Sequence, residues 1–227
     1  MFSLSAAIGG GKHPFPYRTR KLSPLTAIFV LFYEREHMLL LALSTSFLII
    51  SKYTKFMDFD QIIKNRISCR SYSNKEVEEE KLQKILETIR SVPSAGNLQA
   101  FHVVVIKNKR IREELSQISR GKPFLSEAPI CLVFLADKTR AEFKYGDRGR
   151  ELYSVQDATI AASYCQLVAT SLGLSTVWVG AFNPIDVSRI INVESKVPVA
   201  ILPIGYPNGT QEIHEKRKLE DLVSYIE

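Results

Sequence analysis

The sequence predicts an α+β fold, an α/β-type three-layer sandwich in which a mixed sheet is flanked by helices on both faces. Three observations indicate it. Short, continuous apolar runs are typical of buried strands. Apolar residues spaced three and four apart predict amphipathic helices. The two kinds of segment alternate along most of the 227 residues. We expect this domain to span residues 57–227 and to follow an N-terminal extension, residues 1–56.

The first half of the domain contains three predicted helices and two predicted strands. The pattern predicts helices at "MDFDQIIK" (57–64), "EEEKLQKILETIRSV" (78–92) and "KRIREELSQIS" (109–119). In the second of these, acidic residues occupy the first turn, where the helix dipole favours negative charge. The short apolar runs "HVVVIK" (102–107) and "ICLVFLAD" (130–137) predict buried strands.

The second half of the domain is dominated by one long predicted helix. "SVQDATIAASYCQLVATSLG" (154–173) is rich in small residues, which favours close packing, and Gly173 is typical of a helix C-terminus. "STVWVG" (175–180) and "VAILPIGYP" (199–207) predict two more strands, with a helix opened by Pro184 between them. No Gly-x-Gly-x-x-Gly follows a strand, so that route to a Rossmann dinucleotide site is excluded.

The charged residues and cysteines exclude several classes of protein. The net charge is +6, but residues 1–56 carry seven Lys/Arg against two Asp/Glu, whereas residues 57–227 carry 23 against 22. The domain is therefore nearly neutral, and we predict no nucleic-acid partner. Cys69, Cys131 and Cys165 are far apart and odd in number, which favours a reducing, cytoplasmic compartment over a disulfide framework. The histidines and carboxylates follow no metal-binding spacing, so we expect no metal site.

Residues 1–56 differ in composition from the domain. A basic, proline-bearing segment precedes two apolar runs, 25–33 and 38–50, and each is shorter than the roughly 20 residues that a membrane-spanning helix needs. Three interpretations stay open: an upstream region wrongly translated as protein, an interfacial anchor, and a spanning segment. Contact with a membrane is expected only if these residues belong to the mature protein.

The first stretch that indicates chemistry is "NRISCRSY", residues 65–72. In an extended segment alternate side chains share one face, so Arg66, Ser68 and Arg70 would point the same way. Two guanidinium groups and a hydroxyl suit a phosphate and one further electron-rich group. The alternative is a solvated edge strand whose charges prevent pairing with other chains.

Three further stretches have both a functional and a purely structural interpretation. In "SVPSAGNLQAFHVVVI", a turn offers backbone N–H groups and the Asn97 amide, or is simply a turn. In "GLSTVWVGAF", Gly180 and Ala181 leave room for a flat ligand against the backbone, or mark a tight strand exit. In "HEKRKLEDL", three adjacent cations could bind an anion or form a solvated charge run; they are Lys216, Arg217 and Lys218.

Together, in order and spacing, these stretches resemble the nitroreductase family of flavin enzymes. "RISCRSY" is similar to the family's Arg-x-Ser-x-Arg/Lys motif, "PSAGNLQAF" to its Pro-Ser-x-x-Asn turn, and "GLSTVWVGAF" to its Gly-Leu-Gly-Thr-x-Trp-Ile-Gly-Gly-Phe segment. "RGRELYSVQDATIAASY" resembles its central helix and "KRKLEDLV" its closing basic stretch. Ala100 and Phe101 replace the usual Pro-Trp, and the closing stretch lacks its proline. The resemblance covers residues 57–227 and none of residues 1–56.

The resemblance implies a homodimer with one FMN in each of two sites built from both subunits. By this resemblance, Arg66 and Ser68 would hold the FMN phosphate side, joined by Lys216 or Arg217, and Ile67 between them would also bind the cofactor. Arg70 would reach the N1/O2 edge of the flavin. The residues supplied by the partner chain would be Pro93, Ser94 and Asn97. Gly180 and Ala181 would offer backbone at the N5 side.

The implied function is an FMN-dependent oxidoreductase. It would pass hydride from NADH or NADPH through flavin N5 to a nitroaromatic, quinone or similar acceptor in a ping-pong cycle. Because the flavin carries this chemistry, no catalytic side chain is predicted. One alternative is a flavin-consuming or dehalogenating enzyme on the same scaffold, although the short connection at residues 138–154 disfavours a large lid. Another is a non-catalytic flavin-binding or membrane-associated protein. The physiological acceptor and the choice between NADH and NADPH stay open.

Overall fold

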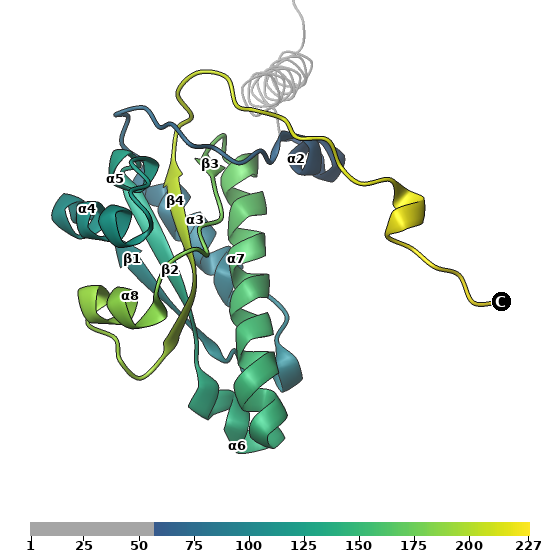
Figure 1. Cartoon of the computed structure of the whole chain (residues 1–227). Helices are drawn as coiled ribbons and strands as arrows, with labels where there is room; N and C mark the ends of the chain where they lie inside the picture. The colour runs from purple at the N-terminus through teal and green to yellow at the C-terminus, as the bar shows by residue number, and fades with distance from the viewer. Residues whose placement is uncertain (1–56) are drawn as a thin grey trace, which may run out of the picture. The chain divides into compact units, whose positions relative to one another are not determined.

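Within residues 57–227, a four-stranded sheet with the order β1-β2-β4-β3 forms the middle layer (Figure 1). The structure is a computed structural model that describes residues 57–227, so the interpretations of residues 1–56 lie outside the described residues. The strands are β1 (Phe101–Ile106), β2 (Ile130–Ala136), β3 (Ser175–Thr176) and β4 (Val197–Gly205). All three ladders are antiparallel, and among the described residues the parallel pairing that makes the sheet mixed is the bridge between Ser68 and Thr176.

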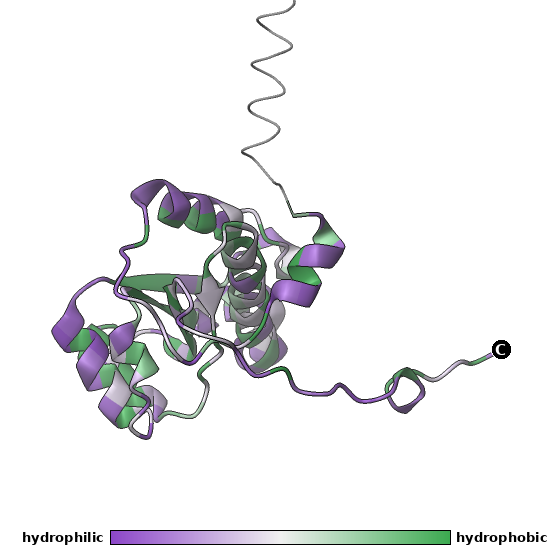
Figure 2. Cartoon of the chain, turned by 90° about the horizontal axis from the view of Figure 1, so that it is seen from above, coloured by the Kyte–Doolittle hydropathy of each residue, from purple (hydrophilic) through white to green (hydrophobic). Residues whose placement is uncertain are grey.

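Helices cover both faces of this sheet. On one face lie α3 (Glu79–Arg90) and α7 (Ser154–Ser171), whose buried residues join one core cluster. On the other lie α4 (Lys109–Ile118), α5 (Phe124–Glu127) and α8 (Pro184–Ile191). Figure 2 shows hydrophobic colour on the helix faces that meet the sheet and hydrophilic colour on the outer faces of α3 and α4. The predicted α+β sandwich is confirmed.

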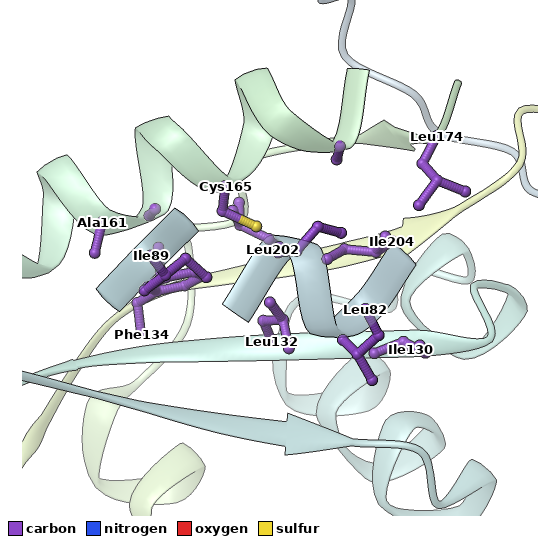
Figure 3. Close-up of a cluster of buried hydrophobic side chains, with 14 of the residues drawn as sticks. Leu82, Ile89, Ile130, Leu132, Phe134, Ala161, Cys165, Leu174, Leu202 and Ile204 are labelled. Carbon is purple, nitrogen blue, oxygen red and sulfur yellow. The ribbon is translucent and has the colours of Figure 1, made fainter. Parts of the chain in front are cut away.

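The burial of strand β2 explains why the sequence pattern predicted a strand there. All seven of its residues are buried, because helices cover both of its faces. Leu132 and Phe134 point into the cluster beneath α3 and α7 (Figure 3), whereas Val133 and Leu135 point into the opposite cluster. A strand that is buried on both faces therefore appears in the sequence as a continuous apolar run.

The long helix α7 is packed through its small residues. Figure 3 shows Ala161 and Cys165 facing the sheet, and Ala158, Ala162 and Ala169 are also buried. Small side chains let the helix approach the strands closely. The face away from the sheet carries Ser163 and Tyr164, and Tyr164 is 42% exposed.

The connection from β2 to α7 is helical. It consists of α6 (Lys138–Arg148) and a π-helical segment, η2 (Gly149–Tyr153). Gly146 has φ 56° and ψ −147°, a conformation that favours glycine, and it interrupts the regular geometry of α6. The sequence predicted a short connection here but not its helices.

The remaining elements are small. The helix α2 (Phe59–Asn65) begins with a capping box in which Gln61 N donates to Asp58 Oδ1 at 2.8 Å. Three-residue 3₁₀ turns follow α3, as η1 (Ala95–Asn97), and occur near the C-terminus, as η3 (Leu219–Asp221). No helix within residues 57–227 combines the length and apolar character needed to cross a bilayer.

Candidate functional site

The arginine-bearing segment, residues 66–72, lies extended beside the sheet. Cys69 N donates to the carbonyl of Thr176 at 3.0 Å, and Asn208 N donates to the carbonyl of Ser71 at 3.0 Å. The segment thus runs between β3 and the residues that follow β4. Cys69 is fully buried while Arg70 is exposed, so neighbouring side chains point to opposite sides here, as expected of extended backbone.

One pocket of about 210 Å³ is lined by the first part of this segment and by part of the C-terminal stretch. Arg66, Ile67 and Ser68 all line it, together with α2 residues and the C-terminal residues Glu212, Ile213, His214 and Lys216. Strict alternation fails at Ile67. The reason is that Arg66 is still the C-cap of α2, with φ −70° and ψ 92°, so the extended conformation is only beginning there.

The pocket has an excess of positive charge. Its lining includes Lys64, Arg66 and Lys216, and its described carboxylate is Glu212, which lies 3.7 Å from His214 Nε2. The lining therefore has two more cationic side chains than carboxylates, which favours the binding of an anion. The Ser68 hydroxyl adds an uncharged hydrogen-bond donor. These residues fit a phosphate group.

The C-terminal stretch reaches the pocket because it is held to the arginine segment. Arg70 N donates to Gln211 Oε1 at 3.2 Å, which places the residues after Gln211 alongside α2. Figure 1 shows this part of the chain passing α2 before it leaves the body of the domain. Of the two predicted phosphate ligands, Lys216 lines the pocket, whereas Arg217 donates to the carbonyl of Asp221 at 2.5 Å.

The second predicted group, Pro93, Ser94 and Asn97, lies in a tight turn before β1. Ser94 Oγ accepts a hydrogen bond from Gln99 N at 2.9 Å. The backbone is left-handed at Gly96 (φ 55°), Asn97 (φ 56°) and Gln99 (φ 52°). Asparagine tolerates this region better than most residues, so the turn can expose the Asn97 amide at modest conformational cost.

A buried carboxylate that sequence reasoning missed holds this turn. Asp157, on α7, is 2% exposed, and its Oδ1 accepts from Ala95 N at 2.9 Å while Oδ2 accepts from Ala100 N at 3.1 Å. One side chain therefore fixes the backbone on both sides of Asn97. The available signal was a lone carboxylate facing the core in an otherwise small and apolar stretch, "SVQDATIAAS".

The third predicted group, Gly180 and Ala181, follows the bridge between Val179 and Ile201. Both residues are exposed, and a Cβ on Gly180 would lie 3.3 Å from Trp178 Nε1. The backbone here is open to a ligand. These residues do not line the pocket at Arg66.

The arginine segment and the turn are tied to different parts of α7. Thr176, which accepts from Cys69 N, also accepts a bond from Gln166 Nε2 at 3.2 Å through its Oγ1. Gln166 lies nine positions beyond Asp157, a rise of about 14 Å along an α-helix. In Figure 1, α2 lies at one end of α7 and α6 at the other. A single chain therefore does not bring Arg66 and Asn97 together.

The three cysteines supply no reactive thiolate to this region. Cys69, Cys131 and Cys165 are all fully buried. Burial raises the pKa of the Cys131 thiol to about 12 and also raises the pKa values of the Cys165 and Cys69 thiols. Nucleophilic chemistry by a cysteine is therefore not indicated.

The sandwich with its long central helix belongs to a known class, the nitroreductase-like folds. The hypothetical oxidoreductase YcnD from Bacillus subtilis has this fold, with a TM-score of 0.68 and 28% identity over 74% of this chain and 74% of that one. An FMN-dependent nitroreductase from Clostridium difficile R20291 aligns with a TM-score of 0.62 and 29% identity, over 72% of this chain and 96% of that one.

Residues 63–124 and 119–206 match the Nitroreductase family, and the chain belongs to this family. Among curated relatives, an NAD(P)H-dependent FMN reductase from Bacillus subtilis (strain 168) is 34% identical over 154 residues, covering 62% of each chain. An NADPH-dependent oxidoreductase from Staphylococcus aureus (strain USA300) is 27% identical over 173 residues, covering 70% of this chain and 68% of the relative.

Proposed function

We propose that this protein is an NAD(P)H-dependent flavin oxidoreductase that binds FMN. The observation that carries the proposal is the cationic pocket at Arg66, Ser68 and Lys216, built where the family's N-terminal and C-terminal basic stretches meet. Family membership and relatives named FMN reductase and FMN-dependent nitroreductase support the cofactor.

The pocket residues have distinct roles in this proposal. Arg66, Ser68 and Lys216 hold the FMN phosphate, with the Ile67 backbone between them. Arg70 extends from the same segment toward the N1/O2 edge of the ring system. A fixed guanidinium there stabilises the negative charge that a reduced flavin gathers. Gly180 and Ala181 offer backbone groups without bulky side chains at the N5 side.

Each site takes residues from two copies of the chain. The rise of about 14 Å along α7 between the anchors of the two groups supports this, because it keeps Asn97 away from Arg66 of the same chain. A two-fold axis beside α7 would place the turn of one chain near the pocket of the other. Pro93, Ser94 and Asn97 then contact the flavin held by the partner. The half-exposed Tyr164 on the outer face of α7 suits such an interface.

The proposed redox reaction needs no acidic or basic side chain as a catalyst, because the flavin carries the chemistry. When bound, FMN would supply the hydride chemistry between NAD(P)H and a nitroaromatic, quinone or similar acceptor. The chain binds and orients the ring, and the turn fixed by Asp157 keeps the Asn97 amide in place. Donor and acceptor would occupy the same open face in turn, which is a ping-pong order.

Visible spectroscopy of the purified protein tests this function. The flavin absorption should be present, should bleach when NADPH or NADH is added without oxygen, and should return when a quinone is added. A protein without flavin that also fails to bind added FMN would contradict the proposal. Flavin that neither nucleotide can bleach would favour the non-catalytic binding protein instead.

A further inference from the structure

The helix α6 packs beside the turn that carries Asn97. A Cβ on Gly96 would lie against the Tyr145 hydroxyl and 2.7 Å from Lys144 Nζ. Arg140 Nε donates a hydrogen bond to the carbonyl of Leu98, in the same turn. If Asn97 contacts the flavin, the side chains of Lys144 and Tyr145 lie at the rim of that site. This step rests on the proposed function.

The cations of α6 and η2 are of three kinds: those paired with carboxylates, Arg140, which is bonded to the turn, and those without such a partner. Lys138 and Arg150 are neutralised, with Lys138 Nζ 2.6 Å from Glu151 Oε2 and Arg150 Nη1 2.9 Å from Glu142 Oε2. Lys144 and Arg148 have no carboxylate within 4.0 Å in the part of the chain that the structure describes. Both are exposed. Their charges are therefore available to an anion from solvent.

Each of these two cations lies beside an aromatic ring. Lys144 Nζ lies 5.4 Å from the centre of the Tyr145 ring, and Arg148 Cζ lies 5.5 Å from the centre of the Tyr153 ring. The two rings meet edge to face, with centroids 5.2 Å apart, and Arg148 Nε donates to Tyr153 Oη at 3.0 Å. The glycine conformation of Gly146 lies between the two cations in sequence. The result is a row of side chains in pairwise contact, Lys144–Tyr145–Tyr153–Arg148, with a cation at each end.

The side chains of that row suit the adenosine end of NADPH, which carries a 2′-phosphate. Exposed cations beside aromatic faces suit a phosphate attached to a flat base. NADPH and NADH have the same nicotinamide, and they differ by the 2′-phosphate on the adenosine. If the nicotinamide lies on the flavin, the adenosine half of the nucleotide extends away from the ring system, and the rim is one surface that it could reach. We propose that Lys144 and Arg148 bind the 2′-phosphate of NADPH and make NADPH the preferred reductant.

Steady-state kinetics with both nucleotides tests the proposal. The wild-type ratio of kcat/KM for NADPH to kcat/KM for NADH should exceed one. Lys144→Ala and Arg148→Ala should each lower that ratio about fivefold, through KM for NADPH, as expected for one solvent-exposed charged contact. Lys84→Ala removes an exposed lysine of α3 that also lacks a carboxylate partner in residues 57–227, and it should leave the ratio unchanged. A wild-type ratio of one, or a ratio that neither substitution moves, would overturn the proposal.

A binding measurement separates this inference from the proposed function. Adenosine 2′,5′-bisphosphate should bind the flavin-loaded wild-type protein at least about tenfold more tightly than AMP, and Arg148→Ala should remove most of that difference. The same result in a protein that oxidises neither nucleotide would keep the phosphate site and defeat only the proposed turnover. Equal binding of the two adenosine phosphates would defeat the phosphate site even in an active enzyme.

Discussion

Asp157 is the single residue on which the shape of the turn most depends. Its carboxylate is buried and accepts two backbone N–H groups, so it compensates its own desolvation while satisfying two donors. Removing it leaves both donors without this acceptor.

We expect Asp157→Ala to lower the free energy of unfolding by about 2–4 kcal/mol, because each unsatisfied buried donor costs about 1–3 kcal/mol. Asp157→Asn keeps one acceptor oxygen and should lose roughly half as much. Urea unfolding followed by circular dichroism measures both. An unfolding free energy that Asp157→Ala leaves unchanged would mean that this pair of hydrogen bonds does not stabilise the fold.

Arg66 and Cys69 provide a matched test of the arginine segment. Arg66 lines the cationic pocket, whereas Cys69 is fully buried on the other side of the same stretch. A charged hydrogen bond to phosphate contributes about 1.5–3 kcal/mol, so Arg66→Ala should weaken FMN binding about ten- to a hundred-fold. Cys69→Ala should leave the affinity nearly unchanged. Fluorescence titration of the apoprotein decides, and similar losses in both variants would remove Arg66 from the phosphate site.

At the scale of elements, the sequence predicted the regular structure where burial alone determines it. The run "ICLVFLAD" predicted 130–137 and the strand is Ile130–Ala136, because both of its faces are covered. "SVQDATIAASYCQLVATSLG" predicted the long helix, which ends at Ser171 with Gly173 at φ 74°. "STVWVG" gave a two-residue strand and one bridge, because the chain leaves the ladder after Thr176 and pairs again only at Val179.

The segments of the candidate site and their division between two chains were predicted by resemblance, but the contacts that position them were not. Motif resemblance indicated the residues at 66–70, 93–97 and 180–181. The distance along α7 between the first two of these segments depends on contacts between distant parts of the chain, which the motifs do not contain. The tie between Thr176 and Gln166 has no sequence signature, and neither does the contact of Lys144 with the turn. The short helix α5 was also missed, since four residues leave no periodicity to detect.

The junction between α3 and β4 carries a pH-dependent contact. Tyr206 Oη donates to the carboxylate of Glu78, the N-cap residue of α3, with distances of 2.6 and 2.9 Å to its two oxygens. This hydrogen bond is the main reason that the pKa of Glu78 falls from 4.5 to about 2. Because the pKa is lowered in the folded state, the stabilisation is present above pH 4.5 and is lost as the pH falls toward 2.

Tyr206→Phe should therefore lower Tm at pH 7, and the difference from wild type should shrink between about pH 4.5 and pH 2. The ring is kept, so its packing against the lysine side chains is retained. Scanning calorimetry across this range measures the difference. A Tm difference that stays constant with pH would show that the hydroxyl acts independently of the Glu78 charge.

At the scale of the whole molecule, the shared site predicts an unusual result in mixed dimers. Arg66→Ala and Asn97→Ala should each impair both sites of their own homodimers. In a dimer with one chain of each kind, one site collects both defects and the other is intact, so about half of the wild-type flavin sites should remain. Differently tagged chains and flavin quantitation measure this. A tight-binding monomer, or two equally impaired sites in the mixed dimer, would contradict the two-chain site.

The division of the chain near Met57 also remains a prediction. Residues 56–227 form one compact unit, and the family match begins at residue 63. A protein that begins at Met57 should fold and bind FMN with the affinity of the full chain. Gel filtration and flavin titration of the two lengths test this. A shortened chain that aggregates while the full chain stays soluble would place part of the folding unit before Met57.

The burial of every sulfhydryl has a consequence for the chemical durability of the protein. All three cysteines of the sequence lie in the core, and desolvation keeps them protonated at neutral pH. Quinones are electrophiles that alkylate ionised sulfur, and stray flavin electrons turn oxygen into peroxide. An exposed thiolate reacts with such compounds. This chain displays none, so repeated turnover should leave its thiols unmodified for as long as it stays folded.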